Sequence, residues 1–143
     1  MTTSEIKAEL NKAREASRAY RLARDKSDAY GQMLMSCKSV RYESNGSTHE
    51  HNGNYVEKAY CSLADYEAES EKLFQEMNKA REYVEKLISF IPDQAQREVL
   101  TRRYIIGQRW EEIADVMNFS VRHTTRLHGI ALKNMSLNVH ISM

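Results

Sequence analysis

The sequence predicts an all-α protein, with a long antiparallel helical hairpin followed by a small domain of helix-turn-helix type. Three observations lead to this fold class. The 143 residues include only one proline and five glycines, so little interrupts a helix. Two long stretches before residue 92 repeat apolar or small side chains at steps of three and four. Residues 108–132 have the pattern of two short helices joined by a tight turn.

The first long helix is expected to begin at Thr3 or Ser4, either of which can cap it, and to end near Tyr42. Residues 43–54, ESNGSTHEHNGN, are polar and turn-forming, and they predict a loop. The inward positions of the helix step by four and three and comprise Ile6, Leu10, Ala13, Ser17 and Tyr20.

The second long helix is expected over residues 55–91, where the heptad pattern is cleaner. Residues 1–42 hold 9 basic and 5 acidic side chains, whereas residues 55–91 hold 5 and 8, so opposite charges favour pairing of the two helices. Polar residues interrupt the seam, which therefore buries little area. We expect a further partner, either a second subunit or the C-terminal domain packing back, and of these we favour a homodimer formed through the hairpin. The interrupting residues are Ser17, Ser27, Glu67, Ser70 and Arg81.

Pro92 marks the expected boundary between the hairpin, residues 1–91, and the second domain, residues 92–135. Asp93 is expected to cap the next helix with Gln96 at its third position, and Gly107 to end it in the left-handed conformation. Residues 136–143 form a tail in which polar and apolar side chains alternate, which suggests an extended segment that could pair with another chain, with a frayed end as the alternative.

The helix-turn-helix is expected in residues 110–117, 118–120 and 121–135. Ala114 is small enough for close helix crossing, Asn118 tolerates a positive φ, Phe119 fills the corner and Ser120 caps the second helix. The inward face of that helix comprises Thr124, Leu127, Ala131 and Met135.

The opposite face of this helix is basic. Between Val121 and Met135 the sequence has three basic residues and no acidic residue, although the net charge of the whole chain is only +1. Arginine can donate two hydrogen bonds to guanine, and a threonine methyl can contact a thymine methyl. These residues therefore predict binding to double-stranded DNA. The residues on this face are Arg122, Thr125, Arg126, Gly129 and Lys133.

Several other residues have a functional and a structural interpretation. Trp110 and Tyr104 have core-compatible spacing, so we expect packing rather than base stacking. His123 and His128 lie five positions apart and cannot share one face of a helix well, which disfavours a metal site. We expect them on the polar surface or against phosphates. A catalytic role for Glu111, Glu112 and Asp115 is disfavoured, since two of these carboxylates suit the first turn of a helix.

The composition argues against an enzyme, a metal site and a membrane protein. His49, His51, Cys37 and Cys61 lack metal-ligand spacing, and two cysteines do not make a disulfide framework. No apolar run approaches the roughly 20 residues that span a bilayer, and the first residues lack the apolar core of a signal peptide. We expect a cytoplasmic protein without catalytic residues, metal or cofactor.

Residues 96–132, QREVLTRRYIIGQRWEEIADVMNFSVRHTTRLHGIAL, resemble region 4 of bacterial RNA polymerase sigma factors, which reads the −35 promoter element. The layout of a long hairpin and then this domain resembles the sigma-like regulators carried by phages and prophages of Gram-positive bacteria. Some of these regulators are thought to activate late phage genes.

The resemblance implies roles for individual residues. Base-reading positions fall on Val121, Arg122, Thr125 and Arg126. Arg109 replaces the usual Ser or Thr cap, Thr124 replaces a buried aliphatic residue, and Val121 replaces a frequent arginine, so promoter preference does not transfer. Phosphate contacts are expected from Arg103, Arg109, the start of the helix at Trp110, His123 and Lys133.

The function expected from these patterns is sequence-specific DNA binding by a transcription regulator of phage or prophage type, an activator of late genes. A first alternative is a sigma-like factor that chiefly binds RNA polymerase and contacts DNA secondarily. A second is a DNA-packaging adaptor like the small terminase subunits, which also combine a helix-turn-helix with a coiled coil. A ring of eight or more subunits would favour that adaptor.

Overall fold

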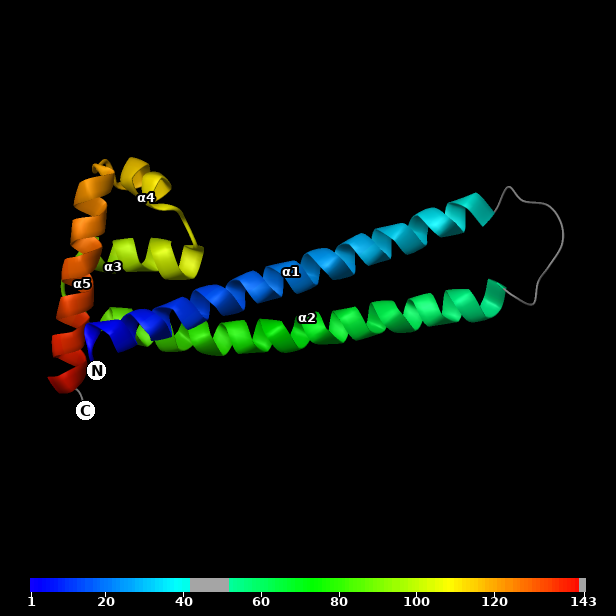
Figure 1. The fold of residues 1–143 in the computed structure, drawn as a ribbon, viewed down its shortest axis with the longest axis horizontal. Helices are drawn as coiled ribbons and strands as arrows, with labels where there is room; N and C mark the ends of the chain where they lie inside the picture. Colours follow the sequence, from blue (N-terminus) through cyan, green and yellow to red (C-terminus); the bar gives the residue numbers. More distant parts are fainter. Residues whose placement is uncertain (42–51, 142–143) are drawn as a thin grey trace. The chain divides into compact units, whose positions relative to one another are not determined.

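A computed structural model describes the backbone of residues 1–41 and 52–141 and the side chains of residues 1–36 and 56–139. Every regular element in these ranges is helical, which confirms the predicted all-α class. In chain order the elements are α1 (Thr3–Arg41), α2 (Asn52–Ser89), α3 (Gln94–Leu100), the π-helical segment η1 (Thr101–Ile106), α4 (Trp110–Met117) and α5 (Val121–Ile141) (Figure 1).

The chain divides into two compact units, and the boundary between them does not lie at Pro92. Unit 1 comprises residues 1–17 and 77–143, and unit 2 comprises residues 18–76. The boundary predicted at Pro92 therefore lies inside unit 1. The predicted extended tail is wrong, because α5 continues as a helix to Ile141. A continuing helix satisfies the backbone hydrogen bonds of residues 136–141 and buries Val139, which an extended end would not do.

The core of unit 1 joins the beginning of the chain to its end. Ile6 and Leu10 from the first turns of α1 are fully buried, as are Ile91, Leu100 and Met135. Figure 1 shows the first turns of α1 (blue) and the last turns of α2 beside the C-terminal half of α5 (red). The C-terminal helices thus pack on the base of the hairpin, as the less favoured of our two expectations had it. The remaining core residues are Ala13, Val84, Leu87, Ile88, Tyr104, Ala131, Leu132 and Val139.

Hydrogen bonds reinforce this core at both ends of the chain. The Ser136 hydroxyl donates to the backbone oxygen of Met1 (3.0 Å), and the Asn138 amide donates to the backbone oxygen of Phe90 (3.0 Å). At the N-terminus of α1, Thr2 accepts a bond from the Glu5 amide, so Thr2 is the cap rather than the predicted Thr3 or Ser4.

The turn between α2 and α3 is held by side chains that follow Pro92 in the sequence. The Asp93 carboxylate accepts a bond from the Ala95 amide (3.0 Å), which confirms the predicted cap. Gln96 does not complete a capping box, because its side chain instead accepts a bond from Asn134 on α5 (2.8 Å). The Arg97 guanidinium donates to the backbone oxygens of Ile91 and Pro92 (2.6 and 2.9 Å).

Unit 2 contains α1 from residue 18 onward and α2 up to residue 76, and these two helical segments pack against each other. Tyr20 lies against Phe74, with ring centroids 5.2 Å apart, and Tyr30 lies edge-on to Tyr66 at 5.3 Å. The residue number rises on α1 as it falls on α2, so the helices are antiparallel, which confirms their predicted pairing. The Lys26 ammonium lies 4.4 Å from the centre of the Tyr66 ring and adds a cation–π contact across the seam. The predicted loop, residues 43–54, lies mostly outside the described residues.

Within the described ranges, the structure has no helix with the length and apolar character that crossing a bilayer demands.

Candidate nucleic-acid interface

Helices α4 and α5 meet at a tight turn formed by Asn118, Phe119 and Ser120. Asn118 adopts the left-handed conformation (φ 56°), as predicted, and its amide and that of Phe119 donate to the last turn of α4. The Ser120 hydroxyl accepts a bond from the His123 amide (3.1 Å), which confirms Ser120 as the cap of α5. Ala114, 2% exposed, lies on the inner face of α4, where its small side chain permits close contact with α5.

Two details of the turn differ from the sequence prediction. Phe119 does not fill the corner, since 38% of its surface is exposed and its ring lies edge-on to His123, with centroids 4.7 Å apart. Thr124, which replaces a buried aliphatic residue of the resembling family, is itself fully buried, and its hydroxyl donates to the Ser120 carbonyl (3.0 Å). The backbone carbonyl thus satisfies the buried hydroxyl group.

The outward face of α5 brings together the four residues predicted to read bases. Val121, Arg122, Thr125 and Arg126 are all exposed on the first turns of this helix. They occupy positions i, i+1, i+4 and i+5, which form one continuous strip of helix surface. We call these four residues the α5 face. Lys133 is also exposed, two turns further along α5.

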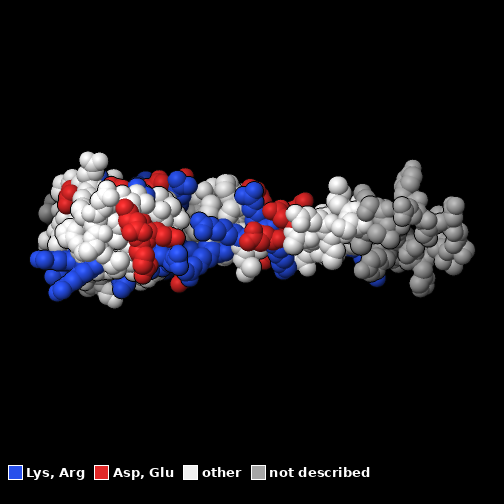
Figure 2. Space-filling model, turned by 90° about the horizontal axis from the view of Figure 1, so that it is seen from above, with Lys and Arg blue, Asp and Glu red and all other residues white. Residues whose placement is uncertain are grey.

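The charge pattern of the surrounding surface suits an anionic partner. The sequence from Val121 to Met143 has no Asp or Glu, so the α5 face has no acidic neighbour on its own helix. Figure 2 shows Lys and Arg side chains at the left edge of the view, separated by uncharged surface from a group of Asp and Glu side chains. A phosphate backbone interacts with this local charge rather than with the net charge of the chain.

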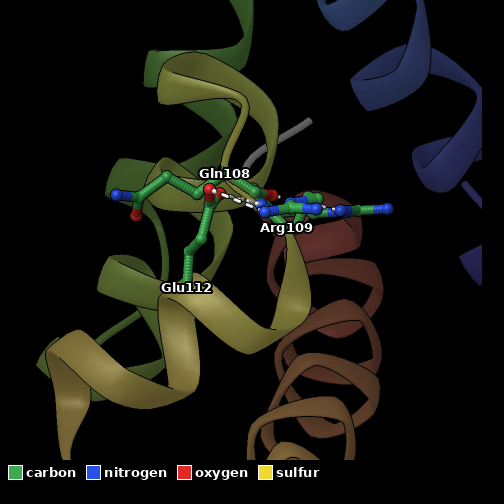
Figure 3. Close-up of polar contacts among 4 residues, drawn as sticks. Gln108, Arg109 and Glu112 are labelled. Carbon is green, nitrogen blue, oxygen red and sulfur yellow. Dashed lines mark hydrogen bonds and ion pairs between the residues drawn. The ribbon is translucent and has the colours of Figure 1, made fainter.

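Arg109 lies at the N-terminus of α4 and remains available to solvent. Its amide donates to the Glu112 carboxylate (2.7 Å), and its guanidinium lies 3.5 Å from the other carboxylate oxygen (Figure 3). The hydrogen bond from the Arg109 backbone amide is the main reason why the pKa of Glu112 is lowered. Glu112 thus replaces part of the capping that a Ser or Thr at position 109 would supply, and 76% of the Arg109 side-chain surface stays exposed.

Arg103, predicted to contact phosphate, is engaged inside unit 1. Its guanidinium donates to the backbone oxygen of Gln108 (3.1 Å) and lies 4.4 Å from the centre of the Trp110 ring. This stacking orders the connection from η1 to α4, which also includes Gly107 in the predicted left-handed conformation (φ 87°). These contacts with Gln108 and Trp110 account for the position of Arg103 without a phosphate. Trp110 is half-buried, as expected of a packing residue.

His128 was expected on the polar surface or against phosphates, but it is buried. The residue is 8% exposed, and its Nε2 lies 2.9 Å from the hydroxyl oxygen of Tyr104. The Trp110 ring packs edge-on against it, with centroids 4.9 Å apart. Burial, with smaller effects of Lys7 and Arg103, lowers the pKa of His128 to about 4. His123, in contrast, is exposed at the start of α5.

The described residues include no group of three or more His, Cys, Asp or Glu side chains that could hold a metal ion. The side chains of Cys37, His49 and His51 lie outside the described residues, and Cys61 is an exposed free thiol. Glu111, Glu112 and Asp115 are exposed on α4.

Comparisons of the chain with protein-family models, with curated proteins and with solved structures found no match.

Proposed function

We propose that the protein is a sequence-specific DNA-binding transcription regulator of phage or prophage type, and that it activates late phage genes. In this proposal α4 and α5 form a helix-turn-helix related to sigma factor region 4, and α5 lies in the major groove. The observation that carries the proposal is the α5 face, which exposes two arginines and a threonine on a helix without acidic residues.

The geometry of unit 1 supports this proposal because it leaves the α5 face uncovered. The C-terminal half of α5 packs on the hairpin base through Ala131, Leu132 and Met135, while the first turns of the same helix carry the exposed α5 face. A groove-binding helix needs this arrangement, with one part anchored in the protein and another free to approach the bases. Arg109 at the start of α4 and Lys133 on α5 are exposed and are suited to phosphate contacts, which position a protein without reading sequence.

Selection of bound fragments from a random pool of double-stranded DNA tests this proposal directly. We expect one sequence to be enriched, and binding to it to weaken steeply with salt, by about −0.9 in log–log slope for each neutralised phosphate. Enrichment of no sequence, with equal weak binding to all DNA, would contradict sequence-specific recognition.

A matched pair of variants locates the reading surface. Arg126→Ala should weaken binding to the selected sequence by about 5- to 150-fold, which corresponds to the discrimination of one bidentate arginine contact. Arg18→Ala in unit 2 removes the same charge from another exposed position and should have a small effect. Equal losses in the two variants would mean that the α5 face does not read bases.

We also propose that unit 2 mediates formation of a homodimer. Among the described side chains of α1 in unit 2, Leu22 is exposed by 71%, Met33 by 53% and Met35 by 69%. Leu22 and Met33 lie eleven positions apart, about three helical turns, so they share one side of α1, and a second copy that covers this side would remove their apolar surface from water. Sedimentation equilibrium of the wild-type protein and of Leu22→Glu tests this, with a dimer expected for the former and a monomer for the latter. A ring of eight or more subunits would favour the packaging adaptor instead.

RNA polymerase remains a proposed partner through the resemblance to region 4. Capture of purified polymerase by the protein in the absence of DNA would favour the sigma-like alternative, and capture only on promoter DNA would favour the regulator.

A further inference from the structure

The hydroxyl group of Thr125 is turned back toward its own helix. Its oxygen lies 3.1 Å from the carbonyl oxygen of Val121 and 3.0 Å from that of Arg122, so the hydroxyl hydrogen is donated within α5. Since a threonine Cβ carries one oxygen and one methyl, the rotamer that directs the hydroxyl to the backbone directs the methyl elsewhere. Thr125 is exposed, and its methyl group therefore forms part of the accessible surface.

Val121 places a second apolar group next to this methyl. It lies one helical turn before Thr125, on the same strip of α5, and 42% of its surface is exposed. The two side chains together form a small apolar row along one edge of the α5 face. We call Val121 and Thr125 the methyl patch.

Basic residues border the methyl patch. Arg122 and Arg126 each follow one of its members in sequence and are both exposed. This combination of an apolar row and a neighbouring row of two arginines is complementary to the major-groove edge of DNA. There, the only apolar group on a base edge is the 5-methyl of thymine, and the strongest arginine acceptors are O6 and N7 of guanine.

We infer that the methyl patch contacts the 5-methyl group of a pyrimidine, and that Arg122 or Arg126 binds a guanine beside it. This inference rests on the proposed function and adds the chemistry of the base that is read. The recognised pyrimidine is thymine, and 5-methylcytosine presents the same methyl group at the same edge. The protein thus detects the methyl substituent as well as the base pair.

Substitution of uracil for thymine in the selected DNA site tests the inference. Uracil keeps the Watson–Crick pair and removes only the 5-methyl group. We expect a loss of affinity of about fourfold at one or two thymines next to a guanine, the effect of leaving one methyl group unburied, and little change at other thymines. At the sensitive position, a 5-methylcytosine–guanine pair should bind more tightly than a cytosine–guanine pair.

Two conservative variants identify the group on the protein that is responsible. Thr125→Ser keeps the hydroxyl and removes the methyl, so it should lose about fourfold on thymine DNA and nothing further on uracil DNA. Thr125→Val keeps the methyl group and replaces the hydroxyl with a second methyl, so it should bind at least as well as the wild type. Binding of all three proteins to non-specific DNA at low salt checks that the variants fold.

The outcomes separate the two proposals. A selected site that binds equally well with uracil at every thymine would overturn the methyl inference and leave sequence-specific binding in place. Tight binding by Thr125→Ser together with weak binding by Thr125→Val would also overturn it, because the hydroxyl would then be the reading group. Failure to select any site would overturn the proposed function itself, and this inference with it.

Discussion

Tyr104 and His128 form a buried hydrogen bond between η1 and α5, with 2.9 Å between the phenol oxygen and Nε2. Tyr104 is 3% exposed and His128 is 8% exposed. This pair fixes the connection that precedes α4 to the middle of α5. Burial raises the pKa of Tyr104 and lowers that of His128, so both groups are neutral near pH 7.

Acid should destabilise unit 1 through His128. The pKa of this residue is about 4 in the folded protein, against 6.5 as its ordinary value. Between these values the unfolded chain binds a proton that the folded protein does not bind, so the free energy of unfolding decreases as the pH falls. The stabilisation is complete above pH 6.5 and is lost by about pH 4, with a magnitude of up to about 3 kcal/mol.

Urea denaturation at several pH values between 7.5 and 4 measures this loss. His128→Gln, which keeps a hydrogen-bonding partner for Tyr104, should show a flatter dependence over the same range because its side chain does not titrate. Carboxylates are present in both proteins and cancel in the comparison. Parallel curves for the two proteins would exclude His128 as the source of the acid sensitivity.

Leu10→Ala should destabilise the domain that contains the α5 face, although residue 10 lies more than a hundred residues away in sequence. Leu10 is fully buried in the core of unit 1, and such a truncation costs about 2–5 kcal/mol. Trp110 is the only tryptophan of the chain, so its fluorescence reports the unfolding of this unit. Leu137→Ala, at a position 64% exposed, is the control and should change stability by no more than about 0.5 kcal/mol. An unchanged Trp110 transition in Leu10→Ala would contradict the shared core.

The turn between α4 and α5 should tolerate glycine better than alanine at position 118. Asn118 has a φ of 56°, a conformation that costs a residue with a Cβ about 1–2 kcal/mol unless its side chain forms local hydrogen bonds. Asn118→Ala should therefore lower the free energy of unfolding by about 1 kcal/mol, while Asn118→Gly should preserve it. Thermal unfolding of the two variants provides the measurement, and equal stability would contradict a conformational role for Asn118.

Arg103 and Lys133 should differ in their effect on the salt dependence of DNA binding, although both were predicted to contact phosphate. Arg103 is occupied by Gln108 and Trp110, whereas Lys133 is exposed. Lys133→Ala should reduce the log–log salt slope by about 0.9, the value for one phosphate. Arg103→Met should leave this slope unchanged and instead lower the midpoint of thermal unfolding. A smaller salt slope in Arg103→Met would restore Arg103 as a phosphate contact.

Local signals in the sequence predicted the structure at several positions where short-range chemistry decides it. Asp93, Asn118 and Ser120 could be assigned because capping and positive φ depend on a few neighbouring atoms. The steps of three and four predicted the buried positions Ile6, Leu10 and Ala13 because helix periodicity determines which face of a helix is inward.

His128 and Arg103 show why the same reasoning was incomplete. His128 follows Thr124 by four residues and precedes Ala131 by three, so its position on the inward face was available from the spacing. Its polar ring suggested the surface, and its partner Tyr104 lies 24 residues earlier on another element. Similarly, nothing in the residues around Arg103 predicts that its guanidinium lies on the Trp110 ring.

The sequence by itself determined the helical class, the caps at Asp93 and Ser120, the turn at Asn118 and the acid-free surface of the last helix, because each depends on residues within one or two turns of each other. Only the tertiary structure decided that Ile6 and Leu10 share a core with Met135, that His128 is buried, and that the α5 face remains exposed. These outcomes depend on contacts between residues far apart in the chain, where the burial of apolar area selects among arrangements that periodicity allows equally.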